Sequence, residues 1–112
     1  MSVRLDCPLC GATLADGAEP VPGCCPRCGA CFTGGADTPQ AAVEALLAAA
    51  GAPEVPAGGL TRRLFELDPD GDLGGSIAIT SDRREGFYRW WVFWRAADGE
   101  LGTLLRRVLA SG

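Results

Sequence analysis

The hydrophobic residues of this 112-residue chain recur at helical spacing in two places. In the first, over residues 39–50, the apolar side chains fall three or four residues apart: Val43, Leu46, Leu47 and Ala50. Thr38 is a suitable N-cap, Pro39 suits the first helical position, and Gly51 is a suitable stop. We therefore predict a helix that packs on the rest of the protein. The alternative is an amphipathic helix that binds a partner.

The second helical pattern lies near the C-terminus, with apolar positions at Leu101, Leu104, Leu105, Val108 and Leu109. Arg106 and Arg107 fall on the opposite side, as expected of an amphipathic helix. Gly102 weakens the helix, and a turn at Asp98-Gly99 could instead pair this segment as a fourth strand. We predict the helix.

Three segments between these helices have features of extended strands: 60–67, 76–81 and 87–96. Turn-rich stretches separate them, at 68–72 and 82–86. Consecutive strands with short connections usually pair with one another, so we predict an antiparallel meander.

A stretch rich in proline and glycine, residues 52–59, has the composition of a linker. We place the main boundary of the chain there. The predicted organisation is a cysteine-rich unit over 1–36, a connecting helix over 37–51, the linker, and a small antiparallel α+β domain over 60–112.

The composition is that of a globular protein, since 47% of the residues are hydrophobic and 21% are charged. No apolar run approaches the roughly 20 residues that a membrane helix needs, and residues 1–6 lack the apolar stretch of a signal peptide. We therefore predict a cytoplasmic protein without a membrane partner. The chain has no histidine, which excludes a histidine-dependent triad and any metal site that uses imidazole.

The net charge of −4 is concentrated in the first half of the chain. Residues 1–59 carry two arginines and six acidic residues, whereas residues 60–112 carry eight of each. Binding to nucleic acids depends mainly on basic side chains that neutralise phosphates. This distribution disfavours a nucleic-acid partner.

Four of the six cysteines occur in two copies of one pattern, Cys-Pro-x-Cys-Gly. Two residues between the cysteines let both sulfurs point at one ion from a tight turn. The proline restricts φ after the first cysteine, and the glycine tolerates the positive φ that follows the second. Two such turns close a tetrahedral site that zinc fills without an open position. The predicted metal ligands are Cys7, Cys10, Cys25 and Cys28.

These paired knuckles, within about residues 4–33, resemble the zinc-ribbon group and more loosely the rubredoxin-like metal knuckles. The resemblance implies a zinc site with the same four ligands but no particular biochemical function, because zinc ribbons appear in many unrelated proteins. Iron is the alternative metal, and in a rubredoxin-like centre it would be redox active. The predicted fold class is α+β: an N-terminal zinc ribbon, then a helix and a small antiparallel β-meander with a C-terminal helix.

Two cysteines, Cys24 and Cys31, remain outside the predicted ligand set. We interpret both as small buried hydrophobic residues, as free cysteines often are. In an alternative, Cys25, Cys28 and Cys31 join the distant Cys7 as ligands of a [4Fe–4S] cluster. Three disulfides are disfavoured because the sequence shows no export signal.

The segment 87–95 contains all three tryptophans of the protein. In a strand, large rings would point to both faces, because alternate residues face opposite ways. One face needs a cover other than the helix of its own domain, either the ribbon or first helix, or a partner. The residues of this candidate interaction surface are Arg89, Trp90, Trp91, Trp94 and Arg95.

The leading functional prediction is a small non-enzymatic zinc-ribbon protein that acts as an interaction or assembly module for a protein partner or as a homodimer. The alternative is a rubredoxin-like or iron–sulfur electron carrier. A third hypothesis is an accessory protein of nucleic-acid machinery, with bases stacked on the aromatic strand.

Overall fold

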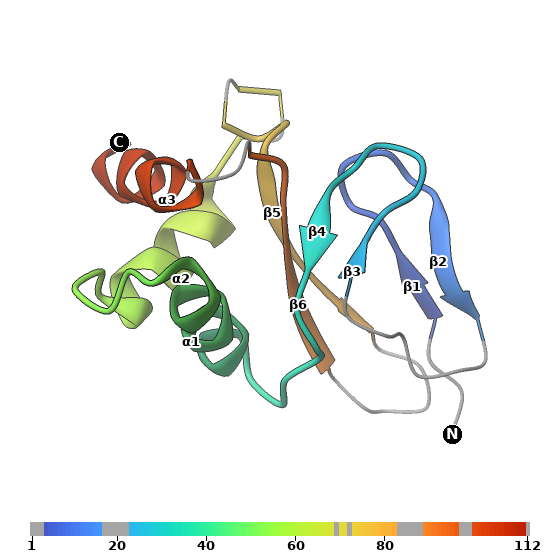
Figure 1. The fold of residues 1–112 in the computed structure, drawn as a ribbon, viewed down its shortest axis with the longest axis horizontal. Helices are drawn as coiled ribbons and strands as arrows, with labels where there is room; N and C mark the ends of the chain where they lie inside the picture. Colours follow the sequence, from blue (N-terminus) through green and yellow to red (C-terminus); the bar gives the residue numbers. More distant parts are fainter. Residues whose placement is uncertain are drawn as a thin grey trace.

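The computed structural model describes residues 4–16, 23–68, 70–71, 73–82, 89–96 and 100–111. Figure 1 shows the described elements in three layers, with helices on one side of a sheet and a small hairpin on the other. This arrangement confirms the predicted α+β class. In chain order the elements are β1 (Arg4–Asp6), β2 (Thr13–Asp16), β3 (Gly23–Cys24), β4 (Cys31–Phe32), α1 (Pro39–Ala50), α2 (Ala57–Glu66), β5 (Ile77–Asp82), β6 (Arg89–Trp94) and α3 (Leu101–Ala110).

The larger sheet has the strand order β3-β4-β6-β5, and all its neighbouring strands are antiparallel. β6 is paired with β5 along its full length, from Arg89 opposite Asp82 to Trp94 opposite Ile77. On its other side β6 pairs with β4, where Phe32 lies opposite Phe93. The sheet therefore joins strands from the cysteine-rich half of the chain to strands from the second half.

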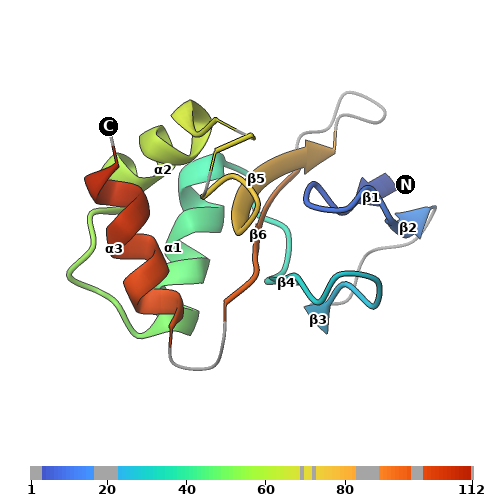
Figure 2. The same ribbon diagram turned by 90° about the horizontal axis from the view of Figure 1, so that it is seen from above.

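The aromatic strand β6 separates two hydrophobic clusters, because successive side chains of a strand point to opposite faces. Val92 belongs to the cluster under the helices, with Val43, Leu46 and other apolar side chains of α1, α2 and α3. Trp91 and Phe93 belong to the cluster on the other face, beneath the cysteine-rich hairpins. Figure 2 shows from above that the helices lie on one side of β6 and the hairpins on the other.

Helix α1 begins and ends as the sequence predicts. The Thr38 hydroxyl accepts a hydrogen bond from the backbone N–H of Ala41 at 3.1 Å, and Pro39 occupies the first turn. Gly51 ends the helix in the left-handed conformation. The C-terminal helix is also confirmed, as α3, with Leu104, Leu105 and Val108 buried. The Asp98-Gly99 turn of the strand alternative lies outside the described residues.

The prediction of a strand over 60–67 is wrong, because this segment lies mostly within helix α2. Leu60 and Leu64 are buried, and they are four residues apart, as neighbours on one face of a helix are. As a strand, the same segment would place Arg62 and Glu66 on the face that carries Leu60 and Leu64. In the helix these two charged residues instead form a salt bridge at the surface, with 3.1 Å between Nε and Oε1.

The segment predicted as a linker, 52–59, is closely integrated with the helices. Ala52 and Val55 are buried in the helical cluster, and residues 57–59 form the first turn of α2. Glu54 forms a salt bridge with Arg106 of α3. The division of the chain into separate domains on either side of residues 52–59 remains a prediction. The described contacts place the two halves against each other in one shared sheet.

Some predicted features fall on residues that the structure does not describe. They include Phe87 and Tyr88 at the start of the aromatic segment, residues 83–86 of the second turn, and Pro69 and Asp72 of the first. Within the described part of the chain, no helix is both long and apolar enough to cross a membrane.

Candidate metal centre

The two Cys-Pro-x-Cys-Gly copies form two matching turns. In the first, the backbone N–H of Gly11 donates to the carbonyl of Cys7 at 2.8 Å, and the N–H of Cys7 donates to the carbonyl of Ala12. The second repeats this pattern eighteen positions later, with Gly29, Cys25 and Ala30 in the same roles. Each turn connects the two strands of a hairpin, β1 to β2 and β3 to β4.

The glycine of each copy has the predicted positive φ, 81° at Gly11 and 80° at Gly29. A side chain at either position would face open space, since a Cβ added there would have no atom within 4 Å. Backbone conformation, and not crowding, therefore explains the glycine in the pattern.

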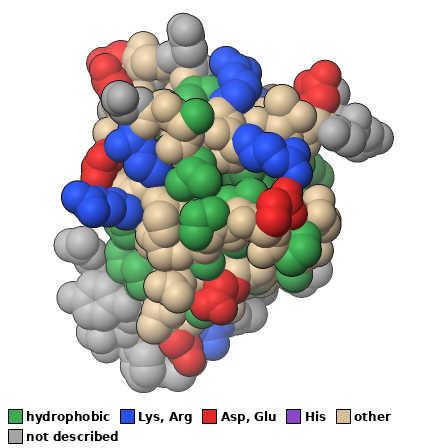
Figure 3. Space-filling view, turned by 90° about the vertical axis from the view of Figure 1, so that its left-hand side faces the viewer, with side chains coloured by type: hydrophobic (Ala, Val, Ile, Leu, Met, Phe, Trp, Pro, Cys, Tyr) green, Lys and Arg blue, Asp and Glu red, His purple; other side chains and the backbone are tan. Residues whose placement is uncertain are grey.

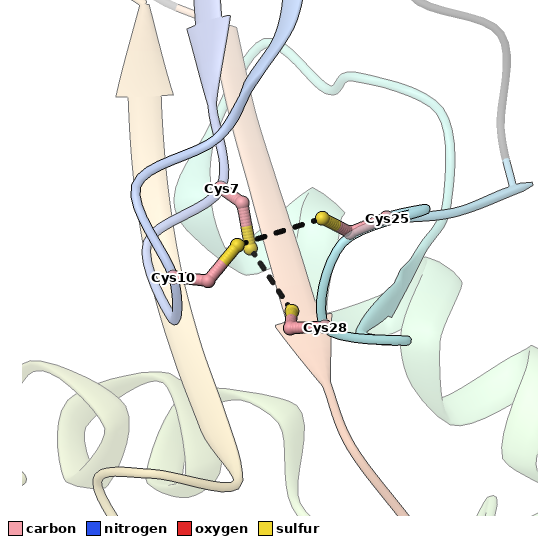
Figure 4. A group of neighbouring side chains, drawn as sticks. All are labelled: Cys7, Cys10, Cys25 and Cys28. Atoms are coloured by element: carbon pink, nitrogen blue, oxygen red, sulfur yellow. Dashed lines mark hydrogen bonds between the residues drawn. The ribbon is translucent and has the colours of Figure 1, made fainter.

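The two turns bring their cysteine sulfurs together at the meeting point of the hairpins (Figure 4). The Sγ atoms of Cys7, Cys10, Cys25 and Cys28 all lie within 4.8 Å of one another. The Cys7–Cys28 and Cys10–Cys25 sulfur distances are both 3.6 Å. A tetrahedral zinc ion with Zn–S bonds of about 2.3 Å requires sulfurs roughly 3.8 Å apart. The four side chains thus fit such an ion with little adjustment.

The four cysteines differ in their surroundings. Cys7 and Cys25 are buried in the cluster with Trp91 and Phe93, whereas Cys10 and Cys28 are half-buried. Burial raises the pKa of the Cys7 thiol to about 12, although the N–H groups of Leu9 and Cys10 lower it.

At Cys25 the hydrogen bonds that lower the pKa outweigh the burial that raises it. Burial again raises the pKa, but the N–H groups of Cys28 and Arg27 point at the sulfur and, with the neighbouring thiols, lower the pKa to about 7. Without a cation the cluster therefore holds both readily and poorly ionised thiols. A bound cation favours the thiolate form of all four.

Among the described residues, these four cysteines are the one group of three or more potential metal ligands that converges in this way. Four thiolates satisfy a tetrahedral ion completely, so this donor set leaves no position for water or substrate. Zinc and ferrous or ferric iron both accept such a set.

Cys24 and Cys31 are not the buried thiols that we expect from the sequence, because they form a disulfide with each other. Cys24 is exposed and Cys31 is half-buried. The bond removes Cys31 from the alternative iron–sulfur ligand set, which required its thiolate.

A signal for this disulfide is present in the repeat. The residues that flank the first turn, Asp6 and Thr13, are register partners in β1 and β2. Eighteen positions later, the corresponding residues are Cys24 and Cys31, which are register partners in β3 and β4. An alignment of the two copies shows that these positions are equivalent, and the folded hairpins show that they lie opposite each other.

The predicted interaction surface is split between the two faces of β6. Trp91 is fully buried under the hairpins, so it cannot contact a partner on the surface of the folded protein. Trp90 and Trp94 are partly buried against the helices. Arg95 is exposed, and its guanidinium Nε donates to the carbonyl of Gly75 at 3.2 Å, while Arg89 is half-buried.

Sequence reasoning missed one aromatic side chain at the surface. Phe65 of α2 is 54% exposed and is the large hydrophobic residue that stands out on the described surface. Its ring meets Trp90 edge to face, with 5.6 Å between the ring centroids. The sequence carries no distinct signal for this residue, because a strand and a helix over this segment both place Phe65 off the face that carries Leu60 and Leu64.

Comparisons with protein-family models, with curated proteins and with solved structures found no match for this chain. In the described structure, four cysteines from two turns form a group that could hold a metal ion.

Proposed function

We propose that this protein is a small, non-enzymatic zinc-binding module whose Cys₄ centre is structural and whose role is protein interaction or assembly. The observation that carries the proposal is the convergence of four sulfurs, within 4.8 Å of one another, from two different hairpins. A cytoplasmic location, predicted from the sequence, is part of the proposal.

A structural role is supported by the position of the site, because a metal there would connect the two sheets. The β1–β2 hairpin belongs to a separate two-stranded sheet and has three register pairs of its own. It rests on the larger sheet through a small cluster in which Leu5 packs with Trp91 and Phe93. An ion bound to Cys7 and Cys10 of one turn and to both cysteines of the other would fasten the two sheets together. In lobes this small, metal binding commonly supplies the free energy of folding.

A non-enzymatic role is supported by the chemistry of the donor set. Catalytic zinc sites keep an open position for water or substrate, whereas four protein thiolates occupy the whole coordination sphere. The chain also has no histidine to act as a general base beside the metal.

An interaction role is supported by the aromatic pair of Phe65, on helix α2, and Trp90, on strand β6. Aromatic residues are enriched in the cores of protein interfaces, and Phe65 is accessible to a partner. On the helical side of the molecule, hydrophobic side chains lie near the middle, with charged side chains of both signs around them (Figure 3). Such a surface suits a protein partner or a second copy of the chain.

The metal assignment is tested by elemental analysis of protein purified without added metal. We expect one zinc per chain, and we expect Cys25→Ser to lose it because serine cannot replace a thiolate ligand. A Cys24→Ala, Cys31→Ala double variant is the control, because it keeps all four candidate ligands: it should bind one zinc when zinc is added in excess, whereas Cys25→Ser should not. Iron in place of zinc would contradict the zinc assignment and favour electron transfer.

The interaction surface is tested by sedimentation velocity over a wide range of protein concentration. We expect reversible self-association that weakens at least about tenfold in Phe65→Ser, the loss of one hot-spot side chain. Arg62→Ser is the matched control, because Arg62 is exposed on the same helix. A wild-type protein that stays monomeric throughout would rule out the homodimer.

A further inference from the structure

The Cys24–Cys31 disulfide closes a ring around half of the metal centre. Its two cysteines are separated by seven positions, and the ligands Cys25 and Cys28 lie between them. Cys24 directly precedes Cys25 in the chain. The disulfide is therefore attached to the backbone of the second turn and restricts how far its two sulfurs can move.

The second turn has few other restraints from its own hairpin. β3 and β4 are two residues long and share two register pairs, Gly23 with Phe32 and Cys24 with Cys31. β3 is at the edge of the sheet, so it has no second neighbouring strand among the described residues. The disulfide links one of these two pairs covalently. It is a covalent connection between the two strands that flank the turn with Cys25 and Cys28.

The disulfide is also accessible to a reagent. Cys24 is exposed and Cys31 is half-buried. Exposed disulfides tend to be the labile or regulatory ones, and disulfides in reducing compartments are usually transient or redox sensing.

We propose that Cys24–Cys31 is a thiol–disulfide exchange site for a dithiol, and that its oxidation state sets the metal affinity of the Cys₄ centre. A thiolate of the dithiol attacks the exposed Cys24 sulfur, and Cys31 leaves as a thiolate. The second thiol of the reagent then attacks its own mixed-disulfide sulfur and releases Cys24 as a thiolate. The dithiol becomes a disulfide, both cysteines become thiols after protonation, and two electrons pass to the protein.

The effect on the metal follows from preorganisation. With the disulfide closed, Cys25 and Cys28 are held near the sulfurs of the first turn before the metal arrives. After reduction, binding must order the second turn, and the lost conformational entropy weakens affinity. Coupling between two sites is reciprocal, so a bound metal must favour the closed disulfide by the same factor. This inference rests on the metal-binding function proposed above.

The test is a comparison of zinc affinity, measured by chelator competition, in oxidised wild type, reduced wild type and Cys24→Ala, Cys31→Ala. We expect the reduced protein and the double variant to bind about tenfold more weakly than the oxidised protein, within the usual range of coupling between sites. Cys31→Ala alone is a further control, because it opens the disulfide and leaves one thiol; it should match the double variant.

Because zinc binding and the closed disulfide favour each other by the same factor, the stability of the disulfide provides a second measurement. Glutathione redox buffers are equilibrated with apo and zinc-saturated protein, and Cys24 and Cys31 are then assigned by alkylation and peptide mapping. The disulfide should resist reduction more in the zinc form, by the factor seen in the affinities. Equal affinities in all forms, with one zinc bound, would overturn the redox inference alone. Failure of every form to bind zinc would overturn the metal-binding proposal as well.

Discussion

Trp91 is a large side chain in the hydrophobic cluster between β6 and the cysteine-rich hairpins. It is fully buried, and its indole nitrogen has no hydrogen-bond partner among the described residues. Its ring lies against Gly35, where an added Cβ would be 2.8 Å from ring carbon Cζ2. The glycine makes room for the ring, and the ring fills space that a smaller residue would leave empty.

Replacing Gly35 with alanine should therefore destabilise the protein. Because the new methyl group would overlap a buried ring with little freedom to shift, we expect a loss of about 1–3 kcal/mol in the free energy of unfolding. Chemical denaturation of the metal-loaded protein measures this change. Gly75→Ala is the control, since a Cβ there meets no atom within 4 Å. Equal effects at both positions would show that crowding against Trp91 is not the cause.

Among the elements, α1 has the clearest local origin. Its first turn is capped by the Thr38 hydroxyl and its last by the left-handed Gly51, while Val43, Leu46 and Leu47 face the core. Each of these features is specified within a short stretch of sequence. Local preference and tertiary packing agree here, which is why the helix bounds are predictable.

Removing the cap should cost a measurable part of the stability of this element. We expect Thr38→Ala to lower the free energy of unfolding by about 1 kcal/mol, because the N–H of Ala41 loses its side-chain acceptor. Thr103→Ala is the matched control: Thr103 is exposed within α3, where alanine has the better helix propensity. Thermal denaturation followed by circular dichroism distinguishes the two. No difference between the variants would argue against the cap.

At the scale of the whole molecule, β6 connects the two hydrophobic clusters. Trp91 and Phe93 pack beneath the hairpins, and Val92 packs beneath the helices. The hairpins with the four cysteines and the helical layer are therefore packed on opposite faces of the same strand. We expect the described molecule to unfold as one cooperative unit and not as two.

Removal of the metal should lower the melting temperature of both layers together. Zinc at a thousandfold excess over its Kd contributes about 4 kcal/mol, which corresponds to a shift of roughly 15 °C or more in a domain of this size. The near-ultraviolet signal of the tryptophans and the far-ultraviolet signal of the helices should shift together when a chelator is added. Cys7→Ser should melt at the lower temperature with or without the chelator. A helical signal that melts unchanged would show that the layers are independent.

Features that depend on near neighbours in the chain were predictable from the amino-acid sequence alone. The candidate ligands Cys7, Cys10, Cys25 and Cys28 were indicated by a five-residue pattern whose proline and glycine favour a tight turn, and the folded chain brings their sulfurs together. The caps of α1 and the helical spacing of α3 are similarly local. In each case the chemistry of a short segment permits few conformations, so the turn or helix predicted from the sequence is also the one in the structure.

Which distant segments meet is a property of the folded chain as a whole. A strand over 60–67 was plausible locally, and α2 forms because Leu60 and Leu64 have α1 and α3 to pack against. The alternation of β6 side chains between two faces was predictable. Which elements cover each face depends on where the hairpins and helices are placed. Cys24 and Cys31 became a disulfide because β3 and β4 pair in one register. These outcomes depend on burial and pairing summed over the whole chain, which no short segment contains.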